Sequence, residues 1–460
     1  MRAAASPLDH AHDPATRERW IGALGRLIGF PTVSAHRSAR PHQQQCAEWL
    51  AGLLASIGMH RAHVLPGVRG GAPSVYADWL GAPGRPTVLL YGHYDVQPAE
   101  PLAEWSVPPF RATVRDGKIY GRGASDDKGQ LLTHLCALES YLATDGALPV
   151  NVKVWIEGEE ELGSPTLEPF LDRYADSLRA RVAVVSATEL AGNRPSIVYG
   201  LRGALAFEIQ VSGATDELHS GRFGGAVLDP VQHLCALVAR MHDPRTGAIA
   251  IPGFLDGVRE LPWDERVRNV REHEHDVDLI RRLGATTASV NDGYGATEHA
   301  TIRPAITLHG LSGGYTGPGW KAIVPASALA RASARLVPDQ DPRRVAASVV
   351  AFARRTLPRG LRWRLRFARG TRGVRMPTTD PVFRAAVQAV RDVWGAPPPF
   401  TVTGGTIPVV EALHRRLAIP VIVLGFGKED DRIHGADERF DIATFYKGVD
   451  TMIRLLAELA

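Results

Sequence analysis

Short apolar segments alternate with amphipathic segments through both ends of this chain, and this alternation constrains the fold more than any other feature. Runs or alternations of apolar residues predict buried strands at 88–91, 150–156, 182–185 and 421–424. Apolar residues at three- and four-residue steps predict helices over 41–58, 131–142, 383–394 and 445–456. We therefore expect an α/β fold in which helices flank a central sheet.

The middle of the chain interrupts this pattern. Strand-like segments at 204–211 and 329–336 lie on either side of a predicted helix near 231–241. A chain of 460 residues is also longer than one hydrophobic core usually serves. We expect one domain built from residues 1–201 and 376–460, with an α+β domain inserted at 202–375.

Composition limits the kinds of binding partner and the cellular compartment that we expect for this chain. The 53 basic and 49 acidic residues leave a net charge of +4, which does not favour a nucleic-acid partner. The first twenty residues contain no apolar signal region, and no window is long and apolar enough for a membrane span. The three cysteines have no C-x-x-C spacing, so a metal would need nitrogen and oxygen ligands. We expect a cytoplasmic protein with no membrane partner.

Histidine and carboxylate residues follow the predicted strands, where open α/β sheets bind their ligands. After the strand at 88–91, His93 has a side chain suited to metal binding through one ring nitrogen, and Asp95 is placed to orient the other. His434 follows the strand at 421–424 and supplies another imidazole. Each of these residues alone is as often structural as catalytic.

Two carboxylate pairs complete the candidate chemistry. Asp126 and Asp127 stand among glycines just before the helix at 131–142. A helix N-cap explains one of these aspartates, whereas a bridging metal ligand better explains the pair. Glu160 and Glu161 follow the strand at 150–156 and offer a general base and a metal ligand, with a solvated acidic loop as the alternative.

The candidate residues lie in four sequence blocks whose order along the chain is informative. They read Y-G-H-Y-D-V-Q-P from Tyr91, G-R-G-A-S-D-D-K-G-Q from Gly121, E-G-E-E-E-L-G-S from Glu157 and I-H-G-A-D-E from Ile433. With Trp105 between the first two, this order resembles the aminoacylase/carnosinase family of metallopeptidases, dipeptidase branch, over nearly the whole chain. The resemblance implies a zinc-peptidase-like catalytic domain with an inserted lid and dimerisation domain. It also implies zinc-dependent hydrolysis of an amide bond in a dipeptide-like substrate that has a free carboxylate.

The resemblance also assigns roles within the first and last parts of the chain. It implies two Zn²⁺ ions, with Mn²⁺ or Co²⁺ as possible substitutes, and a cis peptide between Asp126 and Asp127. Glu160 would be the general base, and Asp95 would be a further catalytic residue that orients His93. The implied zinc ligands are His93, bridging Asp126, Glu161 and His434.

Further roles fall in the inserted segment and just after it. His219 resembles the lid histidine that, in dimeric relatives, reaches the active site of the partner subunit. Arg335 resembles the arginine that binds a substrate carboxylate, for which its planar donors are suited. Gly404, Gly405 and Thr406 resemble the loop that binds the substrate terminus. The resemblance therefore implies a homodimer formed through the inserted domain.

This chain departs from the family at Ala187, where the relatives have an aspartate ligand of the second zinc. Glu189 is a candidate replacement, because residues two apart face the same side of an extended segment. Val402 and Thr403 also replace the usual Arg-Glu. A non-hydrolytic or acyl-transferring relative with an impaired second metal site is one alternative, and an N-acyl-amino-acid deacylase is another. The intact Glu160 favours hydrolysis over the first alternative.

Overall fold

The computed structural model describes residues 6–271, 275–286 and 292–460. The chain divides into two compact units. One contains Met1–Tyr199, Met376–Thr401 and Ile407–Ala460, and the other contains Gly200–Arg375 and Val402–Thr406. Of the segment predicted as the inserted domain, residues 272–274 and 287–291 lie outside the described residues.

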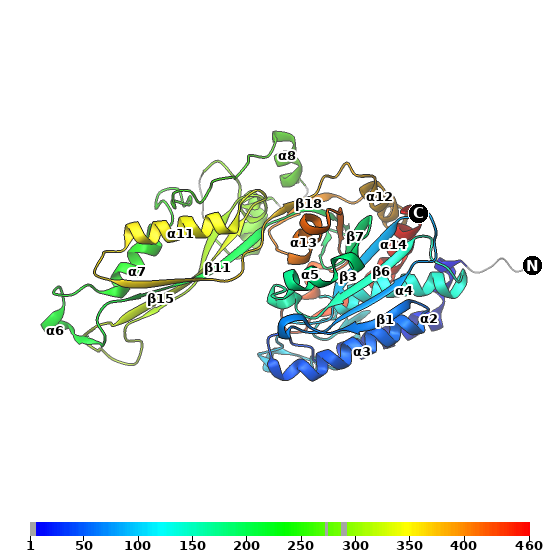
Figure 1. Ribbon diagram of the computed structural model, residues 1–460, viewed down its shortest axis with the longest axis horizontal. Coiled ribbons are helices and arrows are strands. Elements are labelled where there is room, and N and C mark those ends of the chain that lie inside the picture. The colour runs from blue at the N-terminus through cyan, green and yellow to red at the C-terminus, as the bar shows by residue number, and fades with distance from the viewer. Residues whose placement is uncertain (1–5, 272–274, 287–291) are drawn as a thin grey trace, which may run out of the picture. The chain divides into compact units, whose positions relative to one another are not determined.

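The first unit is built around a mixed sheet with strand order β1-β2-β6-β3-β7-β19-β10 (Figure 1). The bounds of these strands are β1 His60–Leu65, β2 Ser74–Trp79, β3 Thr87–His93, β6 Asn151–Glu157, β7 Val182–Val185, β10 Ile197–Leu201 and β19 Val421–Leu424. The four predicted strands are thus confirmed, as is the α/β class. The antiparallel strands β1 and β2 were not predicted.

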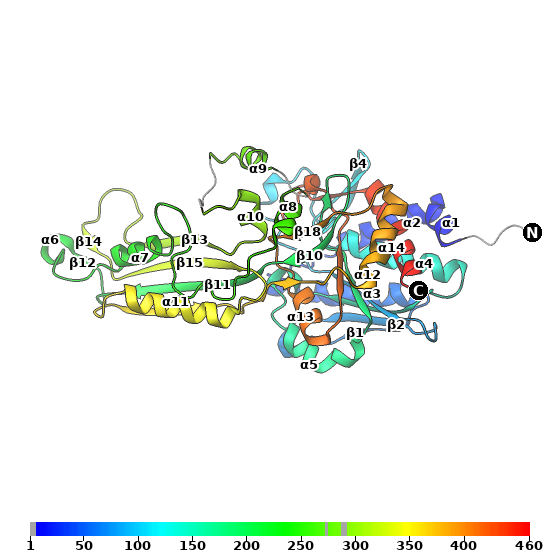
Figure 2. The ribbon, with the colours of Figure 1, turned by 90° about the horizontal axis from the view of Figure 1, so that it is seen from above.

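Helices cover this sheet on both faces (Figure 2). On one side, α14 packs on both α4 and α12, and on the other side α5 and α13 pair. The helices of the unit are α1 Pro7–His12, α2 Pro14–Ile28, α3 Arg40–Ser56, α4 Lys128–Thr144, α5 Leu167–Leu178, α12 Pro381–Trp394, α13 Pro408–Leu417 and α14 Ile442–Glu458. Helix α4 is buried almost all round, because it lies between the sheet and helices α1, α2 and α14.

Three small strands in the first unit form a separate sheet of order β20-β5-β4. Their bounds are β4 Thr113–Arg115, β5 Lys118–Tyr120 and β20 Arg439–Asp441. Strand β20 pairs with β5, so this sheet joins the chain before Asp126 to the chain after His434. Two further strands, β8 Leu190–Ala191 and β9 Arg194–Pro195, pair with each other as a short hairpin.

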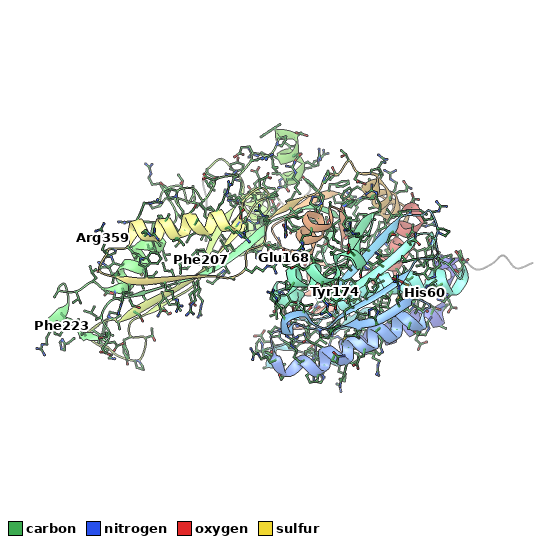
Figure 3. The ribbon with its side chains drawn as sticks, in the orientation of Figure 1. His60, Glu168, Tyr174, Phe207, Phe223 and Arg359 are labelled. Atoms are coloured by element: carbon green, nitrogen blue, oxygen red, sulfur yellow. The ribbon has the colours of Figure 1, made fainter. Side chains whose placement is uncertain are left out.

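The second unit contains an antiparallel sheet of order β13-β15-β11-β16. Its strands are β11 Gly203–Ser212, β13 Ala305–Gly313, β15 Ser327–Leu336 and β16 Arg362–Phe367. Along β11 and β15 buried and more exposed residues alternate, as expected for a sheet with one covered face. Phe207, labelled in Figure 3, is one of the buried residues of β11. Helices α7 Pro230–Ala239 and α11 Pro342–Thr356 cover that face.

Shorter elements complete the second unit. They are β12 Leu218–His219, α6 Ser220–Phe223, α8 Trp263–Arg271, α9 Asp276–Arg282, α10 Ala296–Thr301, β14 Ile323–Val324 and β17 Val374–Arg375; strand β18, Phe400–Thr403, begins in the first unit. Among the described residues of both units, no helix has the length and apolar character needed to cross a bilayer.

Candidate metal centre

The predicted ligands come together because four neighbouring strands of the first unit run in parallel. Strand β3 lies between β6 and β7, and β7 also pairs with β19, all in the same direction. Their carboxyl ends therefore share one edge of the sheet. His93 ends β3, the turn Glu160–Leu162 follows β6, and His434 lies in the loop after β19.

Asp126, Glu161 and His434 form a compact set of ligand atoms. One atom from each of these side chains lies within 4.8 Å of the others. His434 Nε2 is 3.0 Å from Asp126 Oδ2 and 3.2 Å from Glu161 Oε2. The second oxygen of Glu161, Oε1, is buried and has no hydrogen-bond partner within the described part of the chain. Two carboxylates and an imidazole, with one carboxylate oxygen left unsatisfied, fit a divalent metal ion.

His93 faces the other oxygen of the Asp126 carboxylate. Its Nε2 lies 3.2 Å from Asp126 Oδ1, and its side chain is only 1% exposed. The other ring nitrogen, Nδ1, lies 3.2 Å from the backbone oxygen of Asp95 and 3.5 Å from its Oδ1. Asp95 thus borders the His93 ring on the side away from Asp126.

The Asp95 carboxylate also holds the turn that carries the two glutamates. Its Oδ1 accepts the backbone N–H of Glu160 and its Oδ2 accepts that of Glu161, both at 3.1 Å. The same side chain therefore contacts His93 and fixes the backbone from which Glu160 and Glu161 project. Sequence reasoning had placed it only beside His93.

Asp127 occupies the N-cap position of α4, but its side chain does not cap the helix. Instead, its Oδ2 accepts the backbone N–H of His93 at 3.1 Å. The N-cap explanation, which the sequence offered for one of the two aspartates, is therefore wrong. The Asp126–Asp127 peptide bond is cis, as predicted.

The two histidines of this cluster hold protons that a cation would have to displace. Bonds to Asp126 and Glu161 raise the pKa of His434 to about 10. Burial alone would lower the pKa of His93, but its bonds to Asp126 and Asp95 outweigh burial and raise that pKa. Burial likewise opposes ionisation of Asp126, yet the bonds from His434 and His93 keep its pKa below the usual value. Metal binding at such groups releases protons.

Glu160 differs from these ligands. Among the described residues, its carboxylate takes part in no hydrogen bond or ion pair, although its backbone is held by Asp95. Burial raises the pKa of Glu160, and the neighbouring carboxylates of Asp126 and Glu161 raise it further, although His93 partly opposes them. A carboxyl group with a raised pKa beside a metal site is suited to accept and return a proton near neutral pH.

Comparison with known proteins agrees with this geometry. Residues 89–458 match the model of the peptidase family M20/M25/M40. The chain is 31% identical over 459 residues to the Cys-Gly metallodipeptidase dug1 of Schizosaccharomyces pombe, covering 96% of each protein. This chain belongs to the peptidase family M20/M25/M40. It is therefore a metallopeptidase of the dipeptidase branch, as its motif blocks predicted.

Two further M20 relatives extend the comparison. The Beta-Ala-His dipeptidase of Homo sapiens is 29% identical, with 89% of this chain and 82% of that protein covered. The solved M20 family metallo-carboxypeptidase Sso-CP2 from Sulfolobus solfataricus is 29% identical, with a TM-score of 0.86 over 96% of this chain and 99% of that structure. The M20 fold therefore extends over almost the entire chain.

The departure from the M20 pattern at Ala187 lies beside the end of β7. Ser186 is buried and bonds the ring of His134 at 2.8 Å, and the chain bends at Thr188. Glu189 is exposed and forms a β-bridge with Gly427. Within the described residues, Glu189 is not part of the set formed by Asp126, Glu161 and His434. Whether Glu189 binds a metal stays a prediction.

The predicted substrate-binding residues meet in the second unit. Arg335 donates from Nη1 to the hydroxyl of Thr406 at 2.9 Å, and that hydroxyl donates to the backbone oxygen of Arg202 at 2.7 Å. The guanidinium of Arg202 donates to the carbonyl oxygen of Gly404 at 3.3 Å. Neither arginine forms an ion pair with any acidic side chain that the structure describes. Burial, and then the charge of Arg335, lower the pKa of Arg202 to about 10.

His219 lies elsewhere in the second unit. It is exposed at the end of β12, and its Nδ1 accepts the backbone N–H of Gly221 at 3.0 Å. This bond fixes the proton of the neutral ring on Nε2, which leaves Nε2–H free to donate.

Three residues near the predicted metal ligands were not assigned from the sequence. Gln97 donates to Glu161 Oε2 at 2.8 Å, and Arg122 and Glu438 form a buried ion pair at 2.7 Å. All three stand inside the motif blocks that carry the family resemblance. Their position in those blocks was the signal that could have identified them. The sequence of a block does not show which of its residues support the predicted ligands.

Proposed function

We propose that this chain is a zinc-dependent dipeptidase that hydrolyses the peptide bond of a dipeptide with a free carboxylate. The observation that carries the proposal is the convergence of Asp126, Glu161 and His434 beside a Glu160 carboxylate that has no partner among the described residues. The similarity to Cys-Gly and Beta-Ala-His dipeptidases supports the substrate class.

The residues divide the chemistry between them. When bound, a divalent metal ion would polarise the scissile carbonyl and acidify the attacking water. Glu160 accepts a proton from that water and later delivers it to the leaving amine, for which its raised pKa is suited. His219 donates Nε2–H to the developing oxyanion.

Arg335 recognises the free carboxylate of the substrate. The Arg202 and Arg335 pair has no acidic partner among the described residues, so the substrate supplies the compensating charge. Gly404, Gly405 and Thr406 form the adjoining binding loop. Because Val402 and Thr403 replace the family's Arg-Glu, we expect a side-chain preference that differs from that of the dipeptidase relatives.

We further propose that the first zinc ion binds at Asp126, Glu161 and His434 and that the second binds more weakly at His93 and Asp126. The second position lacks a carboxylate because residue 187 is alanine. We expect Ala187→Asp to tighten binding of the second ion by at least about tenfold, since even indirect loss of ligand support usually costs that much. Mn²⁺ and Co²⁺ are the expected substitutes for zinc.

The second unit supports a homodimer. Leu308 and Leu311 of β13 stand opposite Ala332 and Ala330, so they share the face that α7 and α11 cover elsewhere. Yet they are 41% and 46% exposed. In the described part of the chain β13 pairs with β15 alone, which leaves an open edge. A second copy would cover both the edge and the leucines.

The position of His219 also supports a second copy. It pairs with Ile323, at the end of the sheet where β15 begins, whereas Arg335 lies near the end of β15 (Figure 2). The eight residue steps from Ser327 to Arg335 span about 27 Å, whereas a dipeptide spans about 7 Å. A dipeptide bound to Arg335 is therefore out of reach of His219 in the same chain. His219 would serve the active site of the second copy.

A cytoplasmic location is part of the proposal, and the three free cysteines support it. The predicted lack of a nucleic-acid partner stays a prediction.

The test combines zinc analysis with turnover of dipeptides and N-acyl amino acids. Glu160→Gln should retain zinc and lose at least about 100-fold in kcat, the usual contribution of a general base. Glu104→Gln, at an exposed carboxylate of the same unit, is the matched control. Release of amino acids from N-acyl substrates alone would favour the deacylase. Absence of turnover, restored by Ala187→Asp, would favour the non-hydrolytic alternative.

A further inference from the structure

The two loops that carry Asp126 and His434 are joined by a buried ion pair outside the ligand set. Glu438 lies four residues after His434, and Arg122 lies four residues before Asp126. Arg122 Nη1 and Glu438 Oε2 are 2.7 Å apart, and the two side chains are only 2% and 1% exposed. The pair therefore connects segments about 300 residues apart in the sequence, directly behind two metal ligands.

The Glu438 carboxylate fixes the backbone of the Asp126 loop. Its Oε2 accepts the N–H of Gly123 at 2.9 Å, and its Oε1 accepts those of Ser125 and Asp126 at 3.1 and 3.0 Å. Both oxygens are thus used by main-chain donors, and one of these donors belongs to the bridging ligand itself. Charge-assisted bonds of this kind are stronger than bonds between neutral groups.

Arg122 fixes the other two ligand segments. Its Nη2 donates to the backbone oxygen of His434 at 3.2 Å and to that of Pro98 at 3.0 Å. Pro98 follows Gln97, whose side chain donates to Glu161. The guanidinium also lies over the ring of Trp105, 5.2 Å from its centroid. One arginine thus supports the segments of His434 and Glu161, while its partner supports Asp126.

The backbone conformation of His434 explains why this support is needed. Its φ of 64° lies in the left-handed region, which non-glycine residues adopt at a cost. The bond from Arg122 to its carbonyl stabilises that conformation, and in it Nε2 lies 3.0 Å from Asp126. A buried ion pair contributes little net stability compared with apolar residues of similar volume, so stability alone does not account for it.

We propose that Arg122 and Glu438 are positioning residues that set the distance between Asp126 and His434 and thereby the metal affinity. This inference rests on the proposed function, because that proposal identifies these two side chains as ligands. Neither Arg122 nor Glu438 contacts the reacting groups. Their effect should therefore appear in metal binding before it appears in the chemical step.

The experiment measures the dissociation constant for Zn²⁺ by competition with a chromogenic chelator, using the full chain. Glu438→Gln keeps the shape of the side chain but turns an amide N–H₂ towards main-chain donors. Arg122→Lys keeps the charge but replaces the two terminal guanidinium nitrogens, one bonded to Glu438 and the other to backbone oxygens, with a single amine. We expect each variant to bind Zn²⁺ about 10 to 100 times more weakly than the unaltered protein. Excess zinc should restore most of the kcat in both.

The matched control is Glu298→Gln in the second unit. Glu298 is also a buried carboxylate, bonded to Arg266 at 2.7 Å and to the backbone N–H of Gly295 at 2.9 Å. This control should leave zinc affinity unchanged. Melting of the metal-free proteins checks folding, and Arg122→Lys decides the question if Glu438→Gln does not fold.

Unchanged zinc affinity in a folded Arg122→Lys or Glu438→Gln protein would overturn the inference, as would a kcat that excess zinc does not restore. A failure of the proposed function looks different. In that case the unaltered protein itself would bind no zinc or hydrolyse no dipeptide, whatever the variants do.

Discussion

At the scale of single residues, Gly404 and Gly405 are adjacent but have different surroundings. A Cβ on Gly404 would lie 2.1 Å from the backbone oxygen of Ala300 and 2.5 Å from Nη2 of Arg202. A Cβ on Gly405 would meet nothing closer than 3.7 Å. Only Gly404 is therefore required for the contact between the loop at 404–406 and Arg202.

We expect Gly404→Ala to raise the KM for dipeptides at least about tenfold, because the loop must move away from Ala300 and Arg202, and small displacements of a binding group are costly. Gly405→Ala should change KM less than twofold, since its site has room. Steady-state kinetics on both variants tests this. Equal effects of the two substitutions would contradict the assignment of the close contact.

His134 is a second residue whose surroundings determine a measurable property. It is 1% exposed within α4, and its Nε2 bonds Ser186 at 2.8 Å. Burial lowers its pKa from the usual 6.5 to about 3. Below pH 6.5 the unfolded chain therefore binds a proton at this residue and the folded chain does not, so stability is lost as the pH falls towards 3.

We expect His134 to contribute a loss of about 1.6 kcal/mol in the free energy of unfolding between pH 6.5 and pH 5. His134→Gln keeps a polar group opposite Ser186 but removes the titration. Urea unfolding of the metal-free proteins at both pH values provides the measurement. The loss should be smaller in His134→Gln, and an equal loss in both proteins would show that other groups account for it.

At the scale of elements, β13 has exposed leucines and an open edge, as expected for a strand that pairs with a neighbour on both sides. Its leucines stand on the covered face of the sheet, but α7 and α11 do not shield them. Full burial of a leucine side chain is worth about 1.5–3 kcal/mol. A charge at such a position would have to be buried in the proposed dimer.

We expect Leu311→Lys to weaken self-association at least about tenfold, because it removes that burial and places an amine at the edge strand. Sedimentation velocity over a range of protein concentrations measures the change. Leu283→Lys, at a residue 62% exposed in the same unit, is the control and should leave the association unchanged. A monomeric unaltered protein would rule out the dimer.

At the scale of the whole molecule, the active site is proposed to use His219 from one copy and Glu160 from the other. Neither His219→Ala nor Glu160→Gln alone should be fully active. If the two variants are mixed and allowed to exchange subunits, hybrid dimers contain one site with both residues intact. We expect random mixing to restore up to about a quarter of the normal activity.

The control for this experiment mixes Glu160→Gln with a variant that carries both substitutions. No dimer in that mixture contains an intact Glu160, so activity should stay at the level of Glu160→Gln alone. If mixing His219→Ala with Glu160→Gln restores no more activity than this control, His219 does not act across copies.

The sequence by itself determined the α/β class and most of the ligand candidates. Periodicity identifies a buried strand such as 182–185 because side chains repeat locally, and residues at strand ends such as His93 fall at the ligand-binding edge of any parallel sheet. The motif blocks then identified the family, because their order is preserved even where one residue, Ala187, is not.

Only the tertiary structure decided which residues support those candidates. Asp95 holds the Glu160 turn, Asp127 bonds His93 instead of capping α4, and Glu438 reaches the loop of Asp126. These bonds join segments far apart in the chain, and local patterns carry no information about which backbone donors a carboxylate will meet. Their formation depends on strand order and on the packing of loops at one sheet edge, which are properties of the folded chain as a whole.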